Sequence, residues 1–403
     1  MKKLLILLLF PVLAALFSCS KEGTAVPDSY LRAVDSDGEE ITALDVRDGV
    51  TSLEIKVEAT SEWKVSAASD GDWISTSVSR GNKYAKLTVT LLPNYSGAVR
   101  EGSLTFSADG LADVRVVLRQ ESSVSAASML RVMTFNIRVG GKADGSTDTE
   151  GHEWTSVRKQ PCLNMFADVS PDVAMLQECR QEQLNDLQTA LGSEYDFYFY
   201  AVNGKLKEGA EPSCTENVFL ENGARQVIML RKGMFEIQDW GRFFLSETPD
   251  EISTSFGTST YKITLWLKVL FKNTDETVYL FDTHFVTPSR GDVIAKNAQV
   301  NVERIKSIAA DGTVLFGGDF NCDEDDTRLS AVRNFLDCAR TEALATEDSA
   351  TYTGFKDSGW KRLDHLFSRG ARPLNYKVVS DGGYGTRYIS DHFPVYCDFA
   401  IGG

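Results

Sequence analysis

The chain has 403 residues and a formal net charge of −15, and its composition is that of an ordinary globular protein. This length allows two or three domains and a sizeable core. The acidic balance argues against a broad electrostatic surface for nucleic acid, although a small basic site remains compatible with it.

The N-terminus has the pattern of an export signal. A basic start is followed by an apolar run over residues 4–17, which is too short for a comfortable membrane span. A small residue and Cys19 come next and resemble a bacterial lipoprotein cleavage site. We therefore expect residues 1–19 to be a lipoprotein signal peptide that ends in a lipidated Cys19, with plain secretion as the alternative. Residues 20–29 would then be a flexible tether that holds the protein at the membrane of the cell envelope.

The remaining cysteines show no metal-binding spacing and do not fix a disulfide pairing, although an exported protein could oxidise them. These six residues are Cys162, Cys179, Cys214, Cys322, Cys338 and Cys397. Cys179 and Cys397 lie in apolar, strand-like runs, so for these two we expect buried free thiols.

Residues 30–121 have an all-β pattern. Apolar and polar side chains alternate over short segments that Gly, Asn and Asp turns separate; the segments are 52–57, 63–65, 85–90, 103–106 and 114–118. Short strands at this spacing predict an antiparallel β-sandwich. Residues 122–129 are small and polar, and we assign them to a linker.

Several residues of this first region resemble the BACON domain, an immunoglobulin-like module common in exported proteins of Bacteroidetes. They are Trp63, Asp72-Trp73-Ile74, Gly81, Asn94, Arg100-Glu101-Gly102 and Gln120. The resemblance implies either carbohydrate binding through residues 30–121 or a spacer role. Trp63 and Trp73 are a candidate pair for stacking on sugars, but we favour the alternative that both belong to the core.

From residue 130 onward, strand and helix patterns alternate, with amphipathic helices expected near 184–191 and 295–309. Six runs lead into polar residues, as strands that end at a site would: 130–135 at Asn136, 172–176 at Glu178, 277–281 at His284, 313–317 at Asp319 and Asn321, 361–363 at Asp364, and 387–390 at Asp391 and His392. In layered α/β folds, the strand ends at one edge of a sheet form a single surface. Oxygen ligands and imidazoles gathered there would make a site for a hard metal and for acid–base chemistry. The other two histidines fit this pattern less well: His152 lies in a loop, and we expect His365 to be structural.

In sequence order, the motifs of residues 130–403 resemble the endonuclease/exonuclease/phosphatase superfamily. They are Thr134-Phe135-Asn136-Ile137-Arg138, Gln177-Glu178, Leu245-Ser246-Glu247-Thr248-Pro249, Thr283-His284, Gly318-Asp319-Phe320-Asn321, Leu363-Asp364-His365-Leu366-Phe367 and Ser390-Asp391-His392-Phe393-Pro394-Val395. The resemblance implies a four-layer α/β sandwich, in which two packed mixed sheets are flanked by helices. It also implies hydrolysis of a phosphate ester with Mg²⁺ or Mn²⁺.

The resemblance assigns roles to individual residues. Glu178, Asn136 and Asp391 correspond to the metal-binding group. Asp319 corresponds to the residue that orients or deprotonates the attacking water, with Asn321 beside it. His392, with Asp364 as its carboxylate partner, and His284 correspond to the two imidazoles that face the phosphate. Such donors and a divalent cation neutralise the charge that builds on phosphoryl oxygens.

Three positions depart from the superfamily pattern. A Glu expected to pair with His284 is replaced by Ala224. The phosphate-binding Arg is Lys262, which keeps the charge but loses the bidentate fork. Residues 285–288 lack the acidic residue and the second His of the most similar branch. These changes affect the substrate rim rather than the metal and water-orienting residues.

We therefore predict a divalent-metal phosphodiesterase or phosphatase that acts on a small, glycan-linked or lipid head-group phosphate at the cell envelope. A deoxyribonuclease-like nuclease is the alternative within catalysis, and the net charge of −15 disfavours extended nucleic acid without excluding it. A non-catalytic surface lipoprotein that binds carbohydrate is the alternative from another class. Loss of Glu178, Asp319 or His392 would have favoured it, and all three are present.

Overall fold

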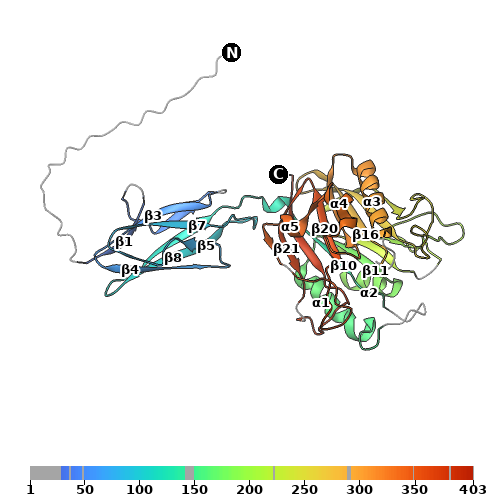
Figure 1. Cartoon of the computed structure of the whole chain (residues 1–403), viewed down its shortest axis with the longest axis horizontal. Helices are drawn as coiled ribbons and strands as arrows, with labels where there is room; N and C mark the ends of the chain where they lie inside the picture. Colours follow the sequence, from blue (N-terminus) through green and yellow to red (C-terminus); the bar gives the residue numbers. More distant parts are fainter. Residues whose placement is uncertain are drawn as a thin grey trace, which may run out of the picture. The chain divides into compact units, whose positions relative to one another are not determined.

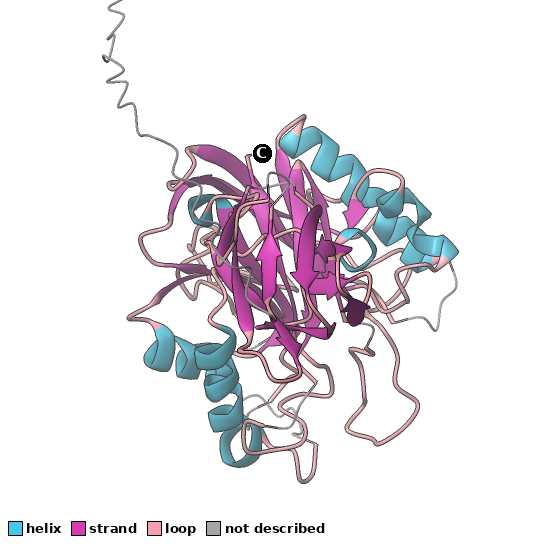
Figure 2. Ribbon diagram, turned by 90° about the vertical axis from the view of Figure 1, so that its left-hand side faces the viewer, coloured by secondary structure: helices cyan, strands magenta, loops and turns pink. Residues whose placement is uncertain are grey.

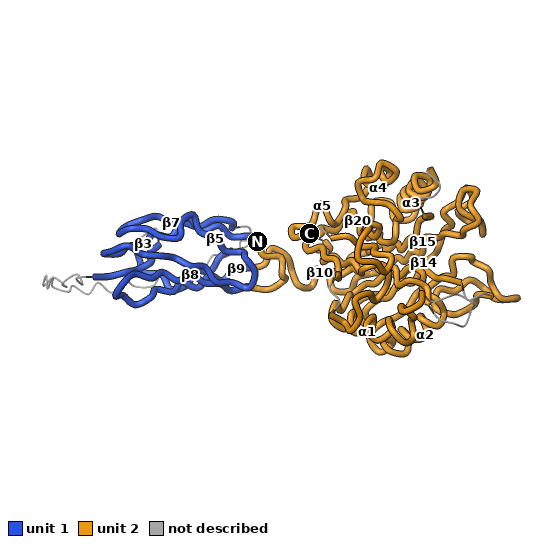
Figure 3. The backbone as a smooth tube through the Cα atoms, turned by 60° about the horizontal axis from the view of Figure 1, so that its bottom comes forward, with its two compact units in different colours: residues 1–93, 100–121 blue, residues 94–99, 122–403 orange. Residues whose placement is uncertain are grey.

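The computed structural model describes residues 29–35, 38–47, 50–140, 149–220, 223–287, 292–347, 349–380 and 383–402. The chain divides into two compact units, which Figures 1 and 3 show: unit 1 comprises residues 1–93 and 100–121, and unit 2 comprises residues 94–99 and 122–403. Residues 94–99, which we assigned to the first domain, thus group with the second unit. The predicted signal peptide and Cys19 lie outside the described residues. No helix within the described ranges is long and apolar enough to cross a membrane.

Unit 1 consists of two β-sheets. One has the strand order β1-β3-β7-β5, and the other has the order β2-β9-β8-β4-β6. The strands are β1 (Leu31–Val34), β2 (Ala43–Val46), β3 (Ser52–Ala59), β4 (Glu62–Ser69), β5 (Ile74–Thr76), β6 (Arg80–Asn82), β7 (Ala85–Leu91), β8 (Arg100–Ala108) and β9 (Val114–Gln120). Alternate side chains such as Ile55, Val57, Leu87 and Val89 point into a shared core, as their period-2 pattern predicts.

The two tryptophans of unit 1 are core residues. Trp63 is 1% exposed and packs edge-on against Phe106 at 6.0 Å, and Trp73 is 3% exposed. A Cβ at Gly81 would lie 2.3 Å from the Trp63 ring, so this glycine permits the close packing. The favoured core assignment is therefore confirmed. The idea that these two rings stack on a sugar is wrong, because neither side chain is more than 3% exposed.

Unit 2 contains two mixed sheets and several helices. The seven-stranded sheet has the order β12-β13-β11-β10-β22-β21-β19, and the six-stranded sheet has the order β14-β15-β16-β17-β20-β18. The strands are β10 (Met129–Asn136), β11 (Val173–Cys179), β12 (Tyr195–Ala201), β13 (Arg225–Arg231), β14 (Phe235–Phe244), β15 (Ile263–Phe271), β16 (Glu276–His284), β17 (Thr313–Asp319), β18 (Asp337–Cys338), β19 (Ala345–Thr346), β20 (Asp364–Arg369), β21 (Ala371–Val378) and β22 (Val395–Ile401). The helices are α1 (Lys159–Val169), α2 (Gln181–Leu191), α3 (Val293–Ala309), α4 (Ser330–Arg333) and α5 (Ala339–Glu342), with shorter helical turns η1 (Ala126–Ser128), η2 (Trp154–Arg158) and η3 (Thr327–Leu329).

The sheets of unit 2 pack face to face, and helices cover their outer sides (Figure 2). Strand β17 shows why its sequence is a continuous apolar run. Leu315 points into the core between the sheets, whereas Val314 and Phe316 point to the opposite face, where they pack with Ile305 of α3. A strand that is buried on both faces needs apolar residues at every position. The predicted four-layer sandwich is confirmed, as are the helices predicted at 184–191 and 295–309, now α2 and α3.

The prediction that six strands end in polar residues is correct for four and wrong for two. Strands β10, β11, β16 and β17 end at or next to their polar residue, but Asp364 begins β20, and Asp391 precedes β22 in a loop. The reason lies in strand direction. Strand β20 is antiparallel to β17 and β22 is antiparallel to β10, so the starts of these strands meet the ends of their neighbours. Both kinds of residue reach the same edge.

All six cysteines of the described chain are free and buried. Burial raises the pKa of the Cys162 and Cys179 thiols to about 12, so both stay protonated at neutral pH. The expected buried free thiol is confirmed for Cys179 and Cys397. These side chains act as small apolar core residues.

Candidate active site

Three neighbouring strands place polar side chains side by side at one edge of the six-stranded sheet. In the strand register, Asp319 of β17 lies opposite His284 of the parallel strand β16 and opposite Asp364 of the antiparallel strand β20. Directly opposed residues lie about 5 Å apart across a sheet. Residues separated by 80 positions in the sequence therefore form one row.

Backbone irregularities in both sheets help to position the site residues. A Cβ at Gly318 would lie 2.0 Å from the Thr283 carbonyl oxygen, so only glycine allows β16 and β17 to approach here. The pairing of β11 with β13 shifts register between Leu176 and Cys179, and Glu178 has a φ of +62° within this bulge. Bulges and left-handed residues are local costs that often redirect a functional side chain.

His392 lies between Asp364, to which it is hydrogen-bonded, and Asp319, with which it makes a longer ion-pair contact. The Nδ1 atom of His392 lies 2.8 Å from Asp364 Oδ2, which also accepts a hydrogen bond from Thr351 Oγ1 at 2.7 Å. The Nε2 atom of His392 lies 3.7 Å from Asp319 Oδ2. Burial lowers the pKa of His392, but Asp364 and Asp319 outweigh that effect and raise it to about 10. The imidazole is therefore protonated at neutral pH, and its Nε2–H is free to donate.

Asp319 is held from several directions at once. It is 2% exposed, and its Oδ1 accepts the backbone N–H of Asn321 at 2.9 Å while its Oδ2 accepts Asn136 Nδ2 at 3.0 Å. Burial raises the pKa of Asp319 to about 7, against the opposing charge of His392. The Asn321 side chain is fixed by the Phe285 carbonyl oxygen at 3.0 Å. Asn136 and Asn321 thus keep the carboxylate in one orientation.

On the other side of Asn136, Glu178 and Asp391 form a second acidic group. Asn136 Nδ2 lies 3.3 Å from Glu178 Oε1, whereas its Oδ1 accepts the backbone N–H of Arg138. The Arg138 Nη1 atom lies 3.7 Å from both Glu178 Oε2 and Asp391 Oδ2. A cationic group therefore lies between these two carboxylates, as a metal ion would. Burial disfavours the charge of Glu178, but the positive charges of Arg138 and Lys262 help to lower its pKa to about 2.

These residues suit a hard divalent cation, because carboxylate oxygens are its preferred ligands. Glu178 and Asp391, which both lie close to Arg138, remain the predicted ligands. Asp319, Asp364 and His392 also bring one ligand atom each to within 4.8 Å of the others, but two of these atoms already share a hydrogen bond. As oriented, the Asn136 amide links Glu178 to Asp319 rather than presenting its oxygen to the pocket. Its role as a metal ligand stays a prediction.

His284 and Lys262 complete the interior of the site. His284 Nε2 lies 3.4 Å from Asp319 Oδ2. Burial and the Lys262 charge hold the pKa of His284 well below its usual value, so its imidazole is neutral. Lys262 precedes β15 and is 9% exposed, and burial lowers its pKa to about 8 although Asp319 and Glu178 favour its charge. Lys262 is thus close to the site electrostatically, but it does not line the pocket described next.

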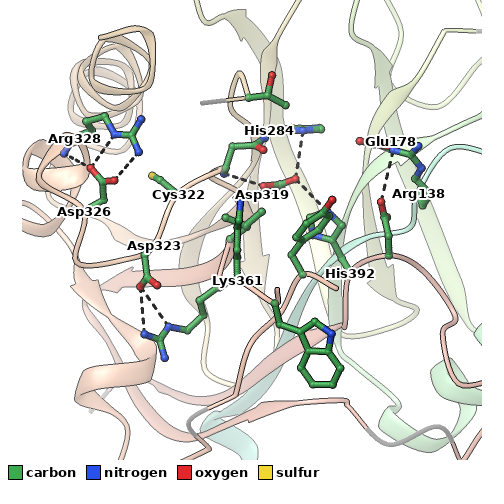
Figure 4. A pocket seen from close by; sticks show the side chains of 17 residues that line it. Arg138, Glu178, His284, Asp319, Cys322, Asp323, Asp326, Arg328, Lys361 and His392 are labelled. Atoms are coloured by element: carbon green, nitrogen blue, oxygen red, sulfur yellow. Dashed lines mark hydrogen bonds and ion pairs between the residues drawn. The ribbon is translucent and has the colours of Figure 1, made fainter. Parts of the chain in front are cut away.

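The site opens into a pocket of about 570 Å³ (Figure 4). The predicted residues that line it are Glu178, His284, Asp319, Asn321, Asp391 and His392; Asn136 and Asp364 lie behind them. The structure excludes His365 from the pocket and shows that its Nε2 lies 2.8 Å from the Cys322 carbonyl oxygen, which confirms a structural role. His152 stacks on Phe355 at 4.0 Å instead of facing the pocket.

The sequence analysis missed much of the pocket wall. It assigned no role to Arg138, Thr287, Asp323, Asp326, Arg328, Tyr352, Trp360, Lys361 and Arg362, all of which line the pocket. The run of charged residues directly after Asn321 was the available signal for Asp323 and Asp326. Thr351, which donates to Asp364, gives no signal in the sequence because isolated threonines are common in loops.

Comparison with known proteins adds two family matches. The sequence model described as "Endonuclease/Exonuclease/phosphatase family" matches residues 133–392, and the BACON model, described as "Putative binding domain, N-terminal", matches residues 61–121. No curated protein matches the chain.

Several solved structures share the fold of unit 2. An endonuclease/exonuclease/phosphatase from Bacteroides vulgatus aligns with 21% identity and a TM-score of 0.58 over 68% of this chain and 99% of its own. The mannosyl-6-phosphatase of Bacteroides thetaiotaomicron aligns with 23% identity and a TM-score of 0.57 over 68% and 100%. TDP2 of D. rerio, in complex with a single-stranded DNA product, aligns with 20% identity and a TM-score of 0.50 over 68% and 99%.

Proposed function

Because the chain belongs to the endonuclease/exonuclease/phosphatase family, we propose that it is a Mg²⁺- or Mn²⁺-dependent hydrolase of phosphoric esters. Its substrate would be a small phosphodiester, glycan-linked or part of a lipid head group. The observation that carries this proposal is the arrangement of the pocket. His392, in contact with Asp364 and Asp319, lies on one side, and the acidic pair Glu178 and Asp391 lies on the other. One side of the pocket suits a cation, and the other suits a water molecule and an anion.

The residues have complementary tasks in this proposal. Asp319, held by two hydrogen bonds, would orient the water that attacks the phosphorus atom. Protonated His392 would donate to a phosphoryl oxygen, and Asp364 keeps its ring in the correct orientation. Neutral His284 would donate to a second oxygen. A bound divalent cation would neutralise negative charge on the phosphoryl group.

Pocket shape and charge favour a small substrate. The charged residues that line the pocket are five acids (Glu178, Asp319, Asp323, Asp326 and Asp391) and five bases (Arg138, Arg328, Lys361, Arg362 and protonated His392). A groove for a polynucleotide needs an excess of positive charge along the backbone. The balance of acids and bases therefore argues against the nuclease alternative and for one ester group bound at the catalytic end.

We also propose that the protein is anchored at the cell envelope through lipidated Cys19, on the basis of the N-terminal sequence. Residues 30–121 would bind carbohydrate. With Trp63 and Trp73 buried, the candidate surface is a groove of about 530 Å³ along β4, β6 and β8, lined by polar residues such as Lys64, Arg80 and Asp109. Glycan-array retention of the full chain, lost in Arg80→Ala, would support this role; no retention would leave unit 1 as a spacer.

The test of hydrolysis uses the chain without residues 1–19. It should hydrolyse bis(p-nitrophenyl) phosphate faster than p-nitrophenyl phosphate with Mg²⁺ or Mn²⁺, and EDTA should abolish both reactions. Nicking of plasmid DNA at a rate comparable to the small diester would favour the nuclease alternative. Turnover that persists in EDTA, or absence of turnover with either ester, would contradict the proposal.

A further inference from the structure

One wall of the pocket is a rigid extension of the catalytic backbone. Tyr352 and Lys361 exchange backbone hydrogen bonds of 2.8 and 3.0 Å. The same segment is bonded to the loop that carries His392: Thr353 N–H donates to the Asp391 carbonyl oxygen at 2.8 Å, and Phe393 N–H donates to the Thr351 carbonyl oxygen at 2.6 Å. This wall therefore keeps a fixed distance from the imidazole that faces the phosphate.

Trp360 is fixed on this wall but is not buried in it. Its Nε1–H donates to the Lys356 carbonyl oxygen at 2.6 Å, and its ring meets Phe393 at 5.7 Å with an interplanar angle of 85°. The side chain nevertheless remains 39% exposed and lines the pocket. An indole anchored at its edge, with its surface open to solvent beside a catalytic site, is a platform on which a flat ligand surface can rest.

The polar groups across the pocket are matched acid–base pairs. Asp326 accepts from Arg328 Nη2 at 2.6 Å and from its Nε at 2.9 Å. Asp323 lies 3.3 Å from Arg362 Nη2, and the Nε atom of the same guanidinium donates to Glu324 Oε2 at 2.8 Å. Figure 4 shows Asp323, Asp326 and Arg328 on the side of the pocket away from Glu178. Paired carboxylates and guanidinium groups offer acceptors and donors together with little net charge. Hydroxyl groups, which both donate and accept, fit such a surface.

We infer that Trp360 and these acid–base pairs together recognise a sugar ring attached to the scissile phosphate. The inference rests on the proposed phosphate site and specifies its substrate. The Trp360 indole would cover the C–H face of the ring, while the Asp326–Arg328 and Asp323–Arg362 pairs bind its hydroxyl groups. A glycerol-type lipid head group has hydroxyl groups but no ring face, so it would contact the acid–base pairs without using the Trp360 indole.

Binding can be tested apart from hydrolysis. Isothermal titration calorimetry of the detergent-solubilised full chain with Mg²⁺, in an Asp319→Asn background that does not consume the ligand, would compare glucose 6-phosphate, glycerol 3-phosphate, methyl phosphate and AMP. We expect glucose 6-phosphate to bind about tenfold more tightly than methyl phosphate, which corresponds to one well-placed aromatic contact. Trp360→Ala should remove this margin, and Trp360→Phe should retain most of it.

Leu344→Ala is the control, because it truncates another exposed apolar side chain of unit 2 that does not line the pocket. Equal binding of glucose 6-phosphate and methyl phosphate, or a margin that survives in Trp360→Ala, would overturn the inference. A larger margin for AMP than for glucose 6-phosphate would also overturn it and assign the wall to a base. A sugar margin in a protein that hydrolyses no ester would refute the proposed function alone.

Discussion

Unit 1 and unit 2 are both built on two sheets packed face to face, yet they use aromatic and ionisable residues in opposite ways. In unit 1, Trp63 is 1% exposed and fills the core. In unit 2, Trp360 is 39% exposed, whereas Asp319 and His392 are buried. Burying an ionisable group is costly unless hydrogen bonds and opposite charges compensate. Unit 2 buries ionisable residues at one sheet edge despite this energetic cost. This concentration of buried ionisable groups indicates that the catalytic chemistry takes place at that edge.

The largest expected effect is the loss of activity when a buried ionisable residue of unit 2 is removed. Asp319→Ala and His392→Ala should each lower kcat for a phosphodiester by about 10²–10⁴-fold, because each removes a positioned proton donor or acceptor. Steady-state kinetics with saturating Mg²⁺ would measure this loss. Asp113→Ala, at an exposed loop position of unit 1, is the matched control. A loss below tenfold in both catalytic variants would be incompatible with the assigned roles.

Trp63→Ala should act on stability instead. Removing this core indole should lower the free energy of unfolding of unit 1 by about 3–5 kcal/mol, because a large cavity remains. Trp360→Ala, which removes the same side chain from a half-open site, should cost far less. Denaturant unfolding followed by circular dichroism would compare the two. Similar losses of stability in both variants would mean that the Trp360 indole is a packing residue.

Two glutamate–arginine pairs provide the next comparison. Glu178→Gln should raise the Mg²⁺ concentration for half-maximal activity at least about tenfold, because a ligand charge beside Arg138 is lost. Glu101→Gln should have no such effect, since Glu101 pairs with Arg119 on the exposed surface of unit 1 at 2.6 Å. Metal titrations of EDTA-treated protein would measure both. An unchanged Mg²⁺ requirement in Glu178→Gln would mean that other residues bind the metal.

The smallest expected effect is the response of unit 2 to acid. Glu324 is 2% exposed, and although burial opposes its charge, Asp323, His365 and Arg362 lower its pKa to about 2. In an unfolded chain a Glu has a pKa of about 4.3. Ionised Glu324 therefore stabilises the fold above that pH, and the contribution disappears as the pH falls toward 2.

Glu324→Gln should accordingly reduce stability at pH 6 more than at pH 3, as urea unfolding at both pH values would show. Glu303→Gln, on the exposed face of α3, provides the comparison with a surface carboxylate. An equal loss at the two pH values would indicate that Glu324 acts through packing rather than through charge.

Much of the fold could be predicted because the signals are local. The alternating pattern of residues 52–57 and 85–90 gives half-buried strands, and the apolar run of 313–317 gives a strand buried on both faces. Strand direction is not local. Asp364 and Asp391 were therefore predicted to follow strands. In the structure, Asp364 is the first residue of β20, and Asp391 lies in the loop before β22.

For the site, the sequence alone determined which residue types were available and in what order: Asn136, Glu178, His284, Asp319, Asp364, Asp391 and His392. Only the tertiary structure decided that β16, β17 and β20 align His284, Asp319 and Asp364 in one row, and that Arg138 lies between Glu178 and Asp391. It alone placed Trp360 and the two Asp–Arg pairs on the pocket wall. The physical reason is that the residue type determines the chemistry of a side chain, whereas its neighbours in space depend on pairings between strands far apart in the chain.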